Sequence, residues 1–501
     1  MIRTGWRNDA GLPATRLLIV RVDYVEGEPE TYVLPAVFAQ GDQEANILGD
    51  RPGAGMISVA RPDSTTGATL CDTTHEGEFW VLLYDAIGRG RTLPGRRGQV
   101  EPLQTQAFSR LGTDVPHETC IHGGEQSNTS AVLGDRLILK LFRRIREGEN
   151  PDLEIGRYLT EQTRLACAPQ LAGALQYRSA NGETYTLAVL HEYVANLGDA
   201  WTYTLDELGR YLERIESELP GPPPAGALPA GSLLDMAQQV PPTLVQELIG
   251  AHLSYAELLG QRTAEMHVAL AAGEDKSFAP EPFTKLYQQG LYQSLRAQAR
   301  RRLDVLRRQA THLPAAVAAD AQQLLASEET LLLGFRELAE RSISALRTRC
   351  HGDFHLGQLL FTGKDFVIID FEGEPDRPIS ERRIKASPLR DVAGMIRSFH
   401  YATHAVCWGP QSESPTTATG GAALAEWLSV WYAWTSASFL KAYLAEASRG
   451  GFLPESRADL ETLLNAYLLE KALYELGYEL NNRPEWVRIP LEGLLQLIQA
   501  K

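Results

Sequence analysis

The hydrophobic pattern changes partway along the chain. Its N-terminal part contains short apolar runs rich in β-branched residues, separated by turn-forming residues, and this pattern predicts strands. Residues 17–22 and 31–34 flank the turn sequence at 26–29, and residues 79–84 form another apolar run. We therefore expect a β-rich beginning of the chain, with residues 79–84 as one of its strands.

The pattern between residues 119 and 194 predicts a sheet with one helix. Apolar residues at 130–133 and 136–142 flank Gly134 and Asp135, a two-residue signal typical of a β-hairpin. Asn150 and Pro151 provide a cap and a first-turn proline for a helix that continues through residue 159. A further strand is expected at 184–194.

After the Pro- and Gly-rich segment 220–232, the apolar residues recur with helical period. This period predicts helices at residues 244–271, 283–308, 319–346, 422–447 and 459–480. One β-rich island, residues 359–361 and 366–370, interrupts the helices and is joined through Gly363 and Lys364. The C-terminal part is therefore expected to be mainly helical.

Composition and charge exclude several classes of protein. The 501 residues are 44% hydrophobic and 22% charged, as in folded globular chains. With 48 Lys and Arg against 63 Asp and Glu, the net charge is −15, which would repel a nucleic acid backbone. Met1–Ala10 has no apolar signal segment, and no stretch approaches the ~20 apolar residues of a membrane span. We expect a cytoplasmic protein with neither nucleic acid nor membrane as a partner.

The most informative chemical pattern lies at residues 351–358, His-Gly-Asp-Phe-His-Leu-Gly-Gln, and at the hairpin that follows. Gln358 and Asp370 carry oxygen atoms of the kind that bind Mg²⁺. Asp353 then remains to orient a hydroxyl group and accept its proton. The spacing of Asp353, Gln358 and Asp370 is that of the base, amide and metal carboxylate of kinases, so it predicts phosphoryl transfer.

Phosphoryl transfer also needs a fixed cation for the nucleotide phosphates. Lys140, central in its predicted strand, is the candidate, and Glu154 in the next helix is its expected partner. Upstream, residues 123–130 form a turn in which backbone amides and the side chains of Ser127, Asn128 and Thr129 can cover phosphates.

Each of these residues also has an ordinary interpretation. A strand lysine is usually a surface residue, a first-turn glutamate usually serves the helix dipole, and two glycines usually mark a turn. His351, Asp353 and His355 could together bind a metal through nitrogen and oxygen. That alternative leaves Gln358 and the Asp370 hairpin without a role, and the ordered set favours the kinase.

A sugar site is indicated on the predicted helix 459–480. Lys471, Tyr474, Glu475 and Tyr478 are spaced i, i+3, i+4 and i+7, which places them on one face. Aromatic rings cover the C–H surfaces of sugars, while charged groups bind hydroxyls. The alternative is that both tyrosines belong to the core and that Lys471 and Glu475 form a surface ion pair.

Four motifs resemble those of the maltokinases, including those fused to trehalose synthase, within the aminoglycoside-phosphotransferase-like small-molecule kinases. Besides residues 351–358, they are Asp-Phe-Glu-Gly-Glu-Pro at 370–375, Glu-Arg-Arg-Ile-Lys-Ala-Ser-Pro-Leu-Arg-Asp at 381–391, and the segment 470–486. The similarity extends from about residue 17 to the C-terminus.

The resemblance implies ATP- and Mg²⁺-dependent phosphorylation of maltose at its anomeric hydroxyl. The products would be ADP and maltose 1-phosphate, which feeds α-glucan (glycogen) synthesis, and trehalose synthase is a candidate partner. Carried over by position, Asp353 is the catalytic base, Gln358 and Asp370 bind magnesium, and Lys140 with Glu154 contacts phosphate. Residues 190–194 match the interlobe hinge, so Glu192 and Val194 would meet adenine, and His355 would lie on the sugar side.

These observations predict an α+β, protein-kinase-like bilobal fold with ATP between the lobes. Its expected parts are a β-rich cap at 1–104, an intermediate sheet-plus-helix subdomain at 105–195, and a helical C-lobe at 196–501. One alternative is a kinase for an aminosugar or aminoglycoside, which the net charge of −15 would suit. Another is a catalytically silent kinase-like scaffold.

Overall fold

The computed structural model describes residues 2–3, 15–40, 44, 55–59, 68–111, 119–122, 128–219, 221–408 and 421–499. The chain forms two compact units. Unit 1 comprises Met1–Ala195 and the later segment Asp370–Arg383, and unit 2 comprises Asn196–Ile369 and Ile384–Lys501. Unit 1 is rich in strands and unit 2 is mainly helical, which confirms the predicted α+β class.

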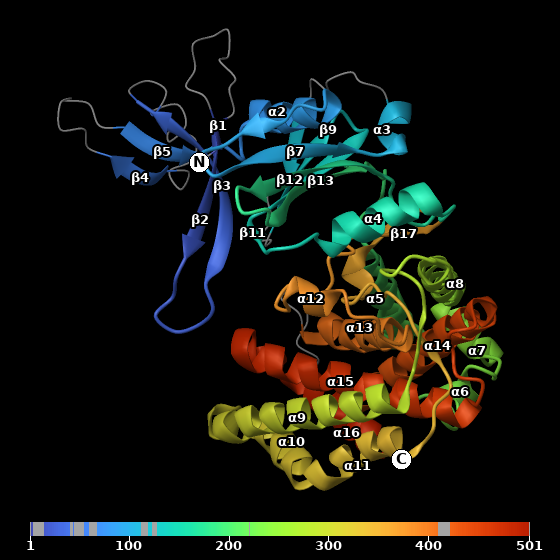
Figure 1. Ribbon diagram of the computed structural model, residues 1–501. Coiled ribbons are helices and arrows are strands. Elements are labelled where there is room, and N and C mark those ends of the chain that lie inside the picture. Colours follow the sequence, from blue (N-terminus) through green and yellow to red (C-terminus); the bar gives the residue numbers. More distant parts are fainter. Residues whose placement is uncertain are drawn as a thin grey trace. The chain divides into compact units, whose positions relative to one another are not determined.

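Two antiparallel sheets form most of unit 1 (Figure 1). Among the described residues, the first sheet contains β1 (Ile2–Arg3), β2 (Arg16–Val22), β3 (Glu30–Ala39), β4 (Gly55–Val59), β5 (Ala68–Asp72) and β11 (Arg144–Ile145). The second has the order β6 (Leu93–Pro94), β7 (Gly98–Gln104), β12 (Leu171–Ser179), β13 (Thr184–Glu192), β10 (Leu137–Phe142), β9 (Asn128–Leu133) and β8 (Thr119–His122).

The predicted hairpin and its following helix are present. Gly134 and Asp135 both have positive φ, 54° and 49°, as a type I′ turn between β9 and β10 requires. The Asn150 side chain caps α4 (Pro151–Gln162) by accepting a hydrogen bond from the Asp152 amide, with Pro151 as the first helical residue. The short helices α3 (Gln106–Leu111) and α12 (Ile379–Arg382) complete unit 1.

The predicted strand at residues 79–84 was wrong, because this segment lies in helix α2 (Gly77–Gly88). Phe79, Trp80, Leu83 and Ile87 are buried at helical spacing, and α2 packs on β7, β8 and β9 of the second sheet. A short apolar run fits a buried helix as well as a strand, and here the tertiary environment decides. The resulting core is shared, since Leu17 of β2 and Val33 of β3 belong to the same buried cluster as α2. The boundary at residue 104 between a cap subdomain and an intermediate subdomain stays a prediction.

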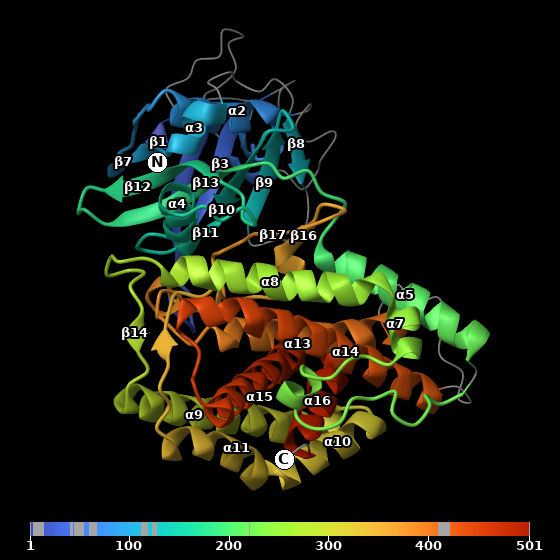
Figure 2. The same cartoon turned by 90° about the vertical axis from the view of Figure 1, so that its right-hand side faces the viewer.

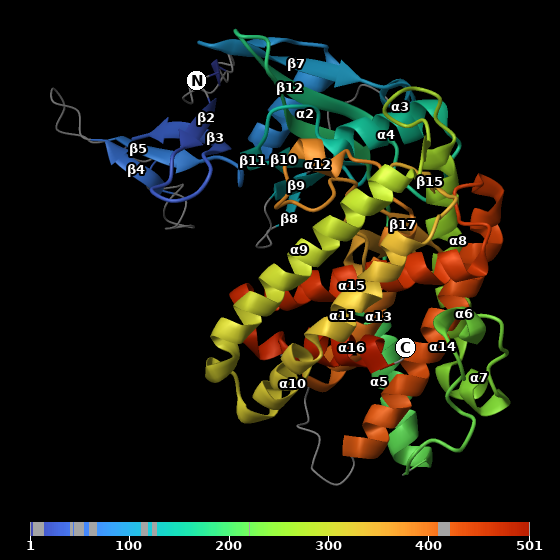
Figure 3. The same ribbon diagram turned by 60° about the horizontal axis from the view of Figure 1, so that its bottom comes forward.

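Unit 2 is a bundle of packed helices (Figures 2 and 3). The helices that contact each other most extensively are α8 (Ala251–Ala271) with α14 (Gly421–Ala447), α13 (Leu389–Trp408) with α15 (Arg457–Asn482), and α9 (Lys285–Gln309) with α11 (Glu328–Glu340). The other helices are α5 (Ala200–Glu218), α6 (Leu233–Met236), α7 (Thr243–Ile249), α10 (Ala315–Ala326) and α16 (Arg488–Gln499). Two predicted helices are each divided, at Gly250 with φ of 62° and at Ser327. The helical period did not single out α5, α13 or α16.

The β-rich island of unit 2 is a small hairpin, β16 (Leu359–Phe361) with β17 (Phe366–Ile368), as predicted. A second two-stranded pair joins β14 (Glu281–Pro282) to β15 (Leu346–Arg347). Within the described ranges, no helix combines the length and the apolar character that a membrane span requires.

His252 on α8 should make the stability of unit 2 depend on pH. Its ring is 1% exposed and stacks with Tyr203 and Trp431, and burial lowers its pKa to about 3. When the pH is below about 6.5, the pKa of histidine in the unfolded chain, His252 therefore binds a proton in the unfolded chain but stays neutral in the folded chain. The free energy of unfolding should then fall by up to about 1.4 kcal/mol for each pH unit between pH 6.5 and pH 4. Burial lowers the pKa of His404 similarly, to about 3.

Urea unfolding of the wild type and of His252→Phe at pH 7.5 and pH 5.5 measures this effect. We expect the variant to lose about 1 kcal/mol less than the wild type between the two pH values. His312→Gln, at an exposed position, is the matched control and should leave the pH dependence unchanged. An equal loss in the wild type and in His252→Phe would show that His252 does not contribute.

Candidate active site

The charged centre of unit 1 is Lys140, which lies in the middle of β10 between β9 and β13. Its Nζ atom donates a hydrogen bond to Asp370 Oδ1 and lies 3.3 Å from Asp152 Oδ2 and 3.4 Å from Glu372 Oε1. Burial alone would lower the pKa of Lys140, but the three carboxylates outweigh it and raise that pKa well above its usual value. Lys140 is therefore a fixed cation, as phosphate binding requires.

The helix partner of Lys140 is Asp152 and not the predicted Glu154. Glu154 instead forms a two-bond ion pair with Arg383, at 2.6 and 3.0 Å. Two residues along an α-helix correspond to a rotation of about 200°, so the two carboxylates point to opposite sides of α4. The first turn of α4 was the correct location for the partner of Lys140. Which residue of that turn meets Lys140 depends on how the helix is oriented to the strand, and sequence spacing does not define that orientation.

Asp370 has an unusual backbone. Its φ is 64°, in the left-handed region that residues other than glycine seldom adopt, and its side chain is 33% exposed. Oδ1 accepts from Lys140, while Oδ2 has no hydrogen bond within the described part of the chain. Such strain is most often retained where it serves a site.

The oxygen atoms of the predicted metal ligands suit an ion that protein side chains coordinate only partly. Mg²⁺ in nucleotide sites takes one or two carboxylates and completes its shell with phosphates and water. Asp370 offers Oδ2, and the side-chain amide of Gln358 likewise makes no hydrogen bond with any described residue. The described residues contain no group of three or more His, Cys, Asp or Glu that could hold a metal alone. Each predicted ligand, Asp370 in unit 1 and Gln358 in unit 2, therefore has an oxygen atom of the kind that Mg²⁺ takes beside a nucleotide.

The structure describes most of the other residues that were predicted to bind the nucleotide. Asn128 begins β9 and donates from Nδ2 to Glu372 Oε1 at 3.1 Å, and Thr129 Oγ1 accepts from Arg143 at 2.9 Å. Ser127 lies outside the described residues. Glu192 is the last residue of β13. Val194 lies two residues later, next to Ala195, where the first segment of unit 1 ends.

In unit 2, Asp353 lies in the loop before the short 3₁₀ helix η3 (Leu356–Gln358). Its Oδ1 is 3.3 Å from Lys471 Nζ, and its side chain is 23% exposed. Burial would raise the pKa of Asp353, but Lys471 and then His355 and His351 outweigh it, so the pKa is below its usual value. Asp353 is therefore a carboxylate at neutral pH and can accept a hydrogen bond from a hydroxyl.

Both histidines of the loop have structural bonds. His351 Nε2 lies 2.9 Å from the Ile369 carbonyl, which requires a proton on that nitrogen, and His355 Nδ1 accepts from the Gly357 amide at 3.1 Å. These bonds organise the loop. They give no support to a metal site made of His351, Asp353 and His355.

Asp391 is a positioning residue that sequence reasoning did not select. Its carboxylate accepts from the amides of His351 at 2.7 Å and Gly352 at 3.0 Å, and it contacts His267 Nε2 at 3.1 Å. Its side chain is 1% exposed. Asp391 thus anchors the loop that carries Asp353, although forty positions separate it from His351. The motif at 381–391, which ends in this residue, was the available signal.

Three of the four residues of the predicted sugar-binding face lie together on α15. Lys471 pairs with Asp353, and its Nζ lies 5.0 Å from the centre of the Tyr474 ring. The rings of Tyr474 and Tyr478 stack with centroids 6.5 Å apart, and Tyr478 is 41% exposed. Lys471, Tyr474 and Tyr478 therefore form a continuous aromatic and cationic surface beside the predicted base.

Glu475 differs from a surface ion-pair residue, because it is buried against α13. Its Oε2 accepts from Arg397 Nε at 2.9 Å and from Nη2 at 2.7 Å, and the Arg397 side chain is 2% exposed. The alternative of a surface ion pair between Glu475 and Lys471 is therefore not what the structure has, since these residues pair with Arg397 and Asp353. Oε1 of Glu475 makes no hydrogen bond within the described residues and remains available.

The chain is similar to several known proteins. A 23% identical relative, glucosamine kinase of Streptacidiphilus jiangxiensis, aligns over 75% of this chain and 73% of its own length. Glucosamine kinase of Mycolicibacterium smegmatis is 30% identical over 30% of this chain and 34% of its own. Two solved glucosamine kinase structures, one with glucosamine, ADP and inorganic phosphate, superpose with TM-scores of 0.59 and 0.62. They cover 98% and 97% of this chain and 95% and 93% of theirs, at 19% identity, and confirm the kinase-like fold.

The sequence profile of one family, described as the phosphotransferase enzyme family, matches residues 118–373. This segment is just over half of the chain and contains Lys140, Asp152, Asp353, Gln358 and Asp370. The chain belongs to the phosphotransferase enzyme family.

Proposed function

We propose that the protein transfers the γ-phosphoryl group of ATP to a hydroxyl of an aminosugar, with glucosamine as the first candidate. The observation that carries the proposal is the similarity, over most of the chain, to proteins named glucosamine kinase. The charged cluster around Lys140 and the loop of Asp353 supply the groups that phosphoryl transfer needs.

On the nucleotide side, Lys140 contacts the phosphates, and Asp152 holds its ammonium in place. Asn128 and Thr129 line the start of β9 beside the phosphates, and Glu192 and Val194 meet the adenine through their backbone. Asp370 and Gln358 would hold Mg²⁺, which neutralises phosphate charge when bound. Glu154 has a different role, because its pair with Arg383 fixes α4 to the segment after Asp370.

On the acceptor side, Asp353 orients the attacking hydroxyl and takes its proton as the oxygen–phosphorus bond forms and ADP leaves. Lys471 holds the carboxylate in position, and Asp391 holds the loop. Tyr474 and Tyr478 cover the sugar ring, with His355 at the entrance of the loop. Glu475 Oε1 is the group best suited to an amino substituent, since it is a carboxylate oxygen without a hydrogen bond in the described part.

Maltose is the second candidate. It is favoured by the motif at 470–486, most of which lies in α15 and which carries the proposed sugar residues. That reading places the phosphate on the anomeric hydroxyl, and only with it does trehalose synthase become a candidate partner. Nothing in α15 requires a substrate amine, so the two sugars must be compared directly.

A substrate panel tests the proposal. ADP release is measured with ATP and Mg²⁺ on glucosamine, N-acetylglucosamine, glucose, maltose, trehalose and an aminoglycoside, and phosphorus NMR locates the phosphate. We expect kcat/KM for glucosamine to exceed that for glucose by about tenfold or more, since an ammonium group paired with a carboxylate is worth more than ~1.4 kcal/mol.

N-acetylglucosamine is the matched control, because it keeps the sugar and removes the positive charge. A preference for maltose would replace the aminosugar by the second candidate. Magnesium-dependent ADP release with none of these acceptors above the rate with water would contradict sugar phosphorylation. No ATP turnover of any kind would support the silent scaffold.

A further inference from the structure

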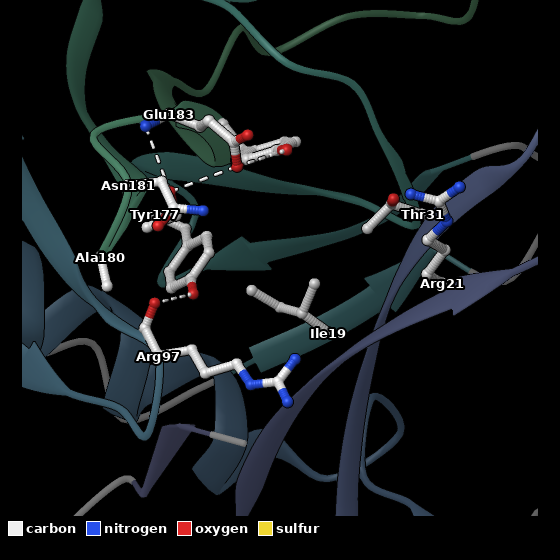
Figure 4. Close-up of a pocket in the computed structure, with 10 residues that line it drawn as sticks. Ile19, Arg21, Thr31, Arg97, Tyr177, Ala180, Asn181 and Glu183 are labelled. Carbon is white, nitrogen blue, oxygen red and sulfur yellow. Dashed lines mark hydrogen bonds between the residues drawn. The ribbon is translucent and has the colours of Figure 1, made fainter.

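Unit 1 contains a pocket of about 490 Å³ that includes none of the proposed active-site residues (Figure 4). One wall is the β2–β3 hairpin of the first sheet, with Ile19 and Arg21. The other wall is formed by Arg97 before β7 and by the β12–β13 turn, with Tyr177, Asn181 and Glu183. The volume lies within the range of about 300–1,000 Å³ that small-molecule sites occupy.

The wall that carries Arg97 is firmly built. The Tyr177 hydroxyl donates to the Arg97 carbonyl at 2.8 Å, and the Ala180 amide donates to the same oxygen at 2.8 Å. Gly98 has a φ of 151°, and a Cβ there would lie 2.2 Å from the Arg178 carbonyl oxygen. Glycine thus permits the close approach of β7 to β12, and the backbone from which the Arg97 side chain projects is held at both ends.

Two guanidinium groups line the pocket from opposite walls. Within the described part of the chain, the Arg97 guanidinium has neither an ion pair nor a hydrogen bond. Arg21 pairs with Asp23 at 2.9 Å, but both side chains are about two-thirds exposed, so water screens this pair. An oxyanion in the pocket can therefore pair with the planar fork of Arg97, and Arg21 on the opposite wall adds positive charge to the lining.

The remaining lining suits a hydroxylated ring. The Tyr177 ring faces the pocket opposite Ile19, and its centroid is 6.1 Å from that of Tyr185 (Figure 4). The Glu183 carboxylate accepts from the Tyr185 hydroxyl at 3.4 Å, and Asn181 adds an amide at the rim. Aromatic faces beside carboxylate and amide groups are the combination that binds sugar rings.

We propose that this pocket is a binding site for a sugar monophosphate. Arg97 and Arg21 hold the phosphate, Tyr177 covers the ring, and Asn181 and Glu183 bind its hydroxyls. The site is defined by its own residues, and only the source of the ligand, as the product class of the enzyme, rests on the proposed function.

Isothermal titration calorimetry of the full chain with glucose 6-phosphate and with glucosamine 6-phosphate tests this site. We expect Arg97→Ala to weaken binding by about tenfold or more, and Arg21→Ala, from the opposite wall, to do the same. Arg96→Ala is the matched control, because Arg96 is the exposed neighbour outside the pocket, and its affinity should stay within about twofold of the wild type. Binding in the active site is common to all variants, so the difference between Arg97→Ala and Arg96→Ala isolates the pocket.

Equal affinity in Arg96→Ala and Arg97→Ala, or no binding in the wild type, would overturn the proposal. Inorganic phosphate bound as tightly as the sugar phosphates would show a simple anion site, and glucose bound as tightly would show that the arginines do not select phosphate. Circular dichroism checks the fold of each variant, and a loss in Arg21→Ala supports the site even if Arg97→Ala unfolds. Because the readout is binding, absent kinase activity would refute the proposed function and leave this result standing.

Discussion

Asp353→Asn should lower kcat by about 10²- to 10⁴-fold while ATP binding changes by no more than about twofold. Asparagine keeps the size of the side chain but cannot accept a proton and carries no charge. Lys471, 3.3 Å away, then faces a neutral amide and no longer holds a carboxylate toward the acceptor hydroxyl. Lys140 and Asp370, which we propose to serve the nucleotide, are unchanged by this substitution.

The experiment combines ADP release under saturating substrates with calorimetric titration of ATP in the absence of sugar. Asp304→Asn is the matched control, because Asp304 lies on α9 with a side chain that is 59% exposed, and its activity should match the wild type. An Asp353→Asn enzyme with wild-type kcat would remove Asp353 from the mechanism. A large loss of ATP affinity would move Asp353 from the acceptor side to the nucleotide side.

The size of the loss also distinguishes two roles for Asp353. Phosphoryl transfer passes through a loose transition state in which the acceptor hydroxyl loses its proton late, so orientation alone supplies part of the rate. A loss near 10²-fold would indicate that Asp353 mainly orients the hydroxyl, since the asparagine amide can still hold it. A loss near 10⁴-fold would indicate that proton acceptance is needed as well.

Features set by neighbouring residues could be predicted from the sequence. The hairpin at Gly134 and Asp135 and the cap at Asn150 depend on two or three consecutive residues, and the structure has both. The loop of Asp353 and the hairpin before Asp370 are also local, and the family match covers them. The order of these local motifs along the chain, with the family resemblance that they carry, therefore predicted a kinase-like fold before any contact was known.

Features set by distant contacts could not be predicted in the same way. Whether Asp152 or Glu154 meets Lys140 depends on how α4 lies against β10, and the period of the helix alone leaves both open. Asp391 holds the loop of Asp353 by accepting hydrogen bonds from backbone amides, a role that the motif ending in Asp391 does not by itself specify. The burial of Glu475 depends on Arg397 on α13, 78 positions earlier, and the periodicity of α15 showed only that the residue shares a face with Lys471.

Arg397→Met should destabilise unit 2 by about 3–5 kcal/mol, the cost of leaving one partner of a buried ion pair uncompensated. The Arg397 side chain is 2% exposed and that of Glu475 is 10% exposed, so water can replace only a small part of the lost interaction with the carboxylate. Arg397 also packs against α16, where a Cβ at Gly493 would lie 2.2 Å from Arg397 Nη1. Urea unfolding followed by tryptophan fluorescence measures the effect, because Trp427, Trp431 and Trp434 are buried in α14 of the same unit.

The control for burial is Arg336→Met, which breaks an exposed i,i+4 pair with Glu340 whose side chains are about 60% exposed and should cost less than about 1 kcal/mol. Adding Glu475→Gln to Arg397→Met removes the stranded charge and should recover part of the loss, since the two residues are coupled. If Arg397→Met lowers the free energy of unfolding no more than Arg336→Met does, then water or another group solvates Glu475, and its carboxylate does not depend on Arg397.

A large loss of stability in Arg397→Met, together with a Glu475→Gln enzyme whose KM rises for sugar but not for ATP, would assign Glu475 two roles. Oε2 would hold α13 and α15 together, and Oε1 would bind the substrate.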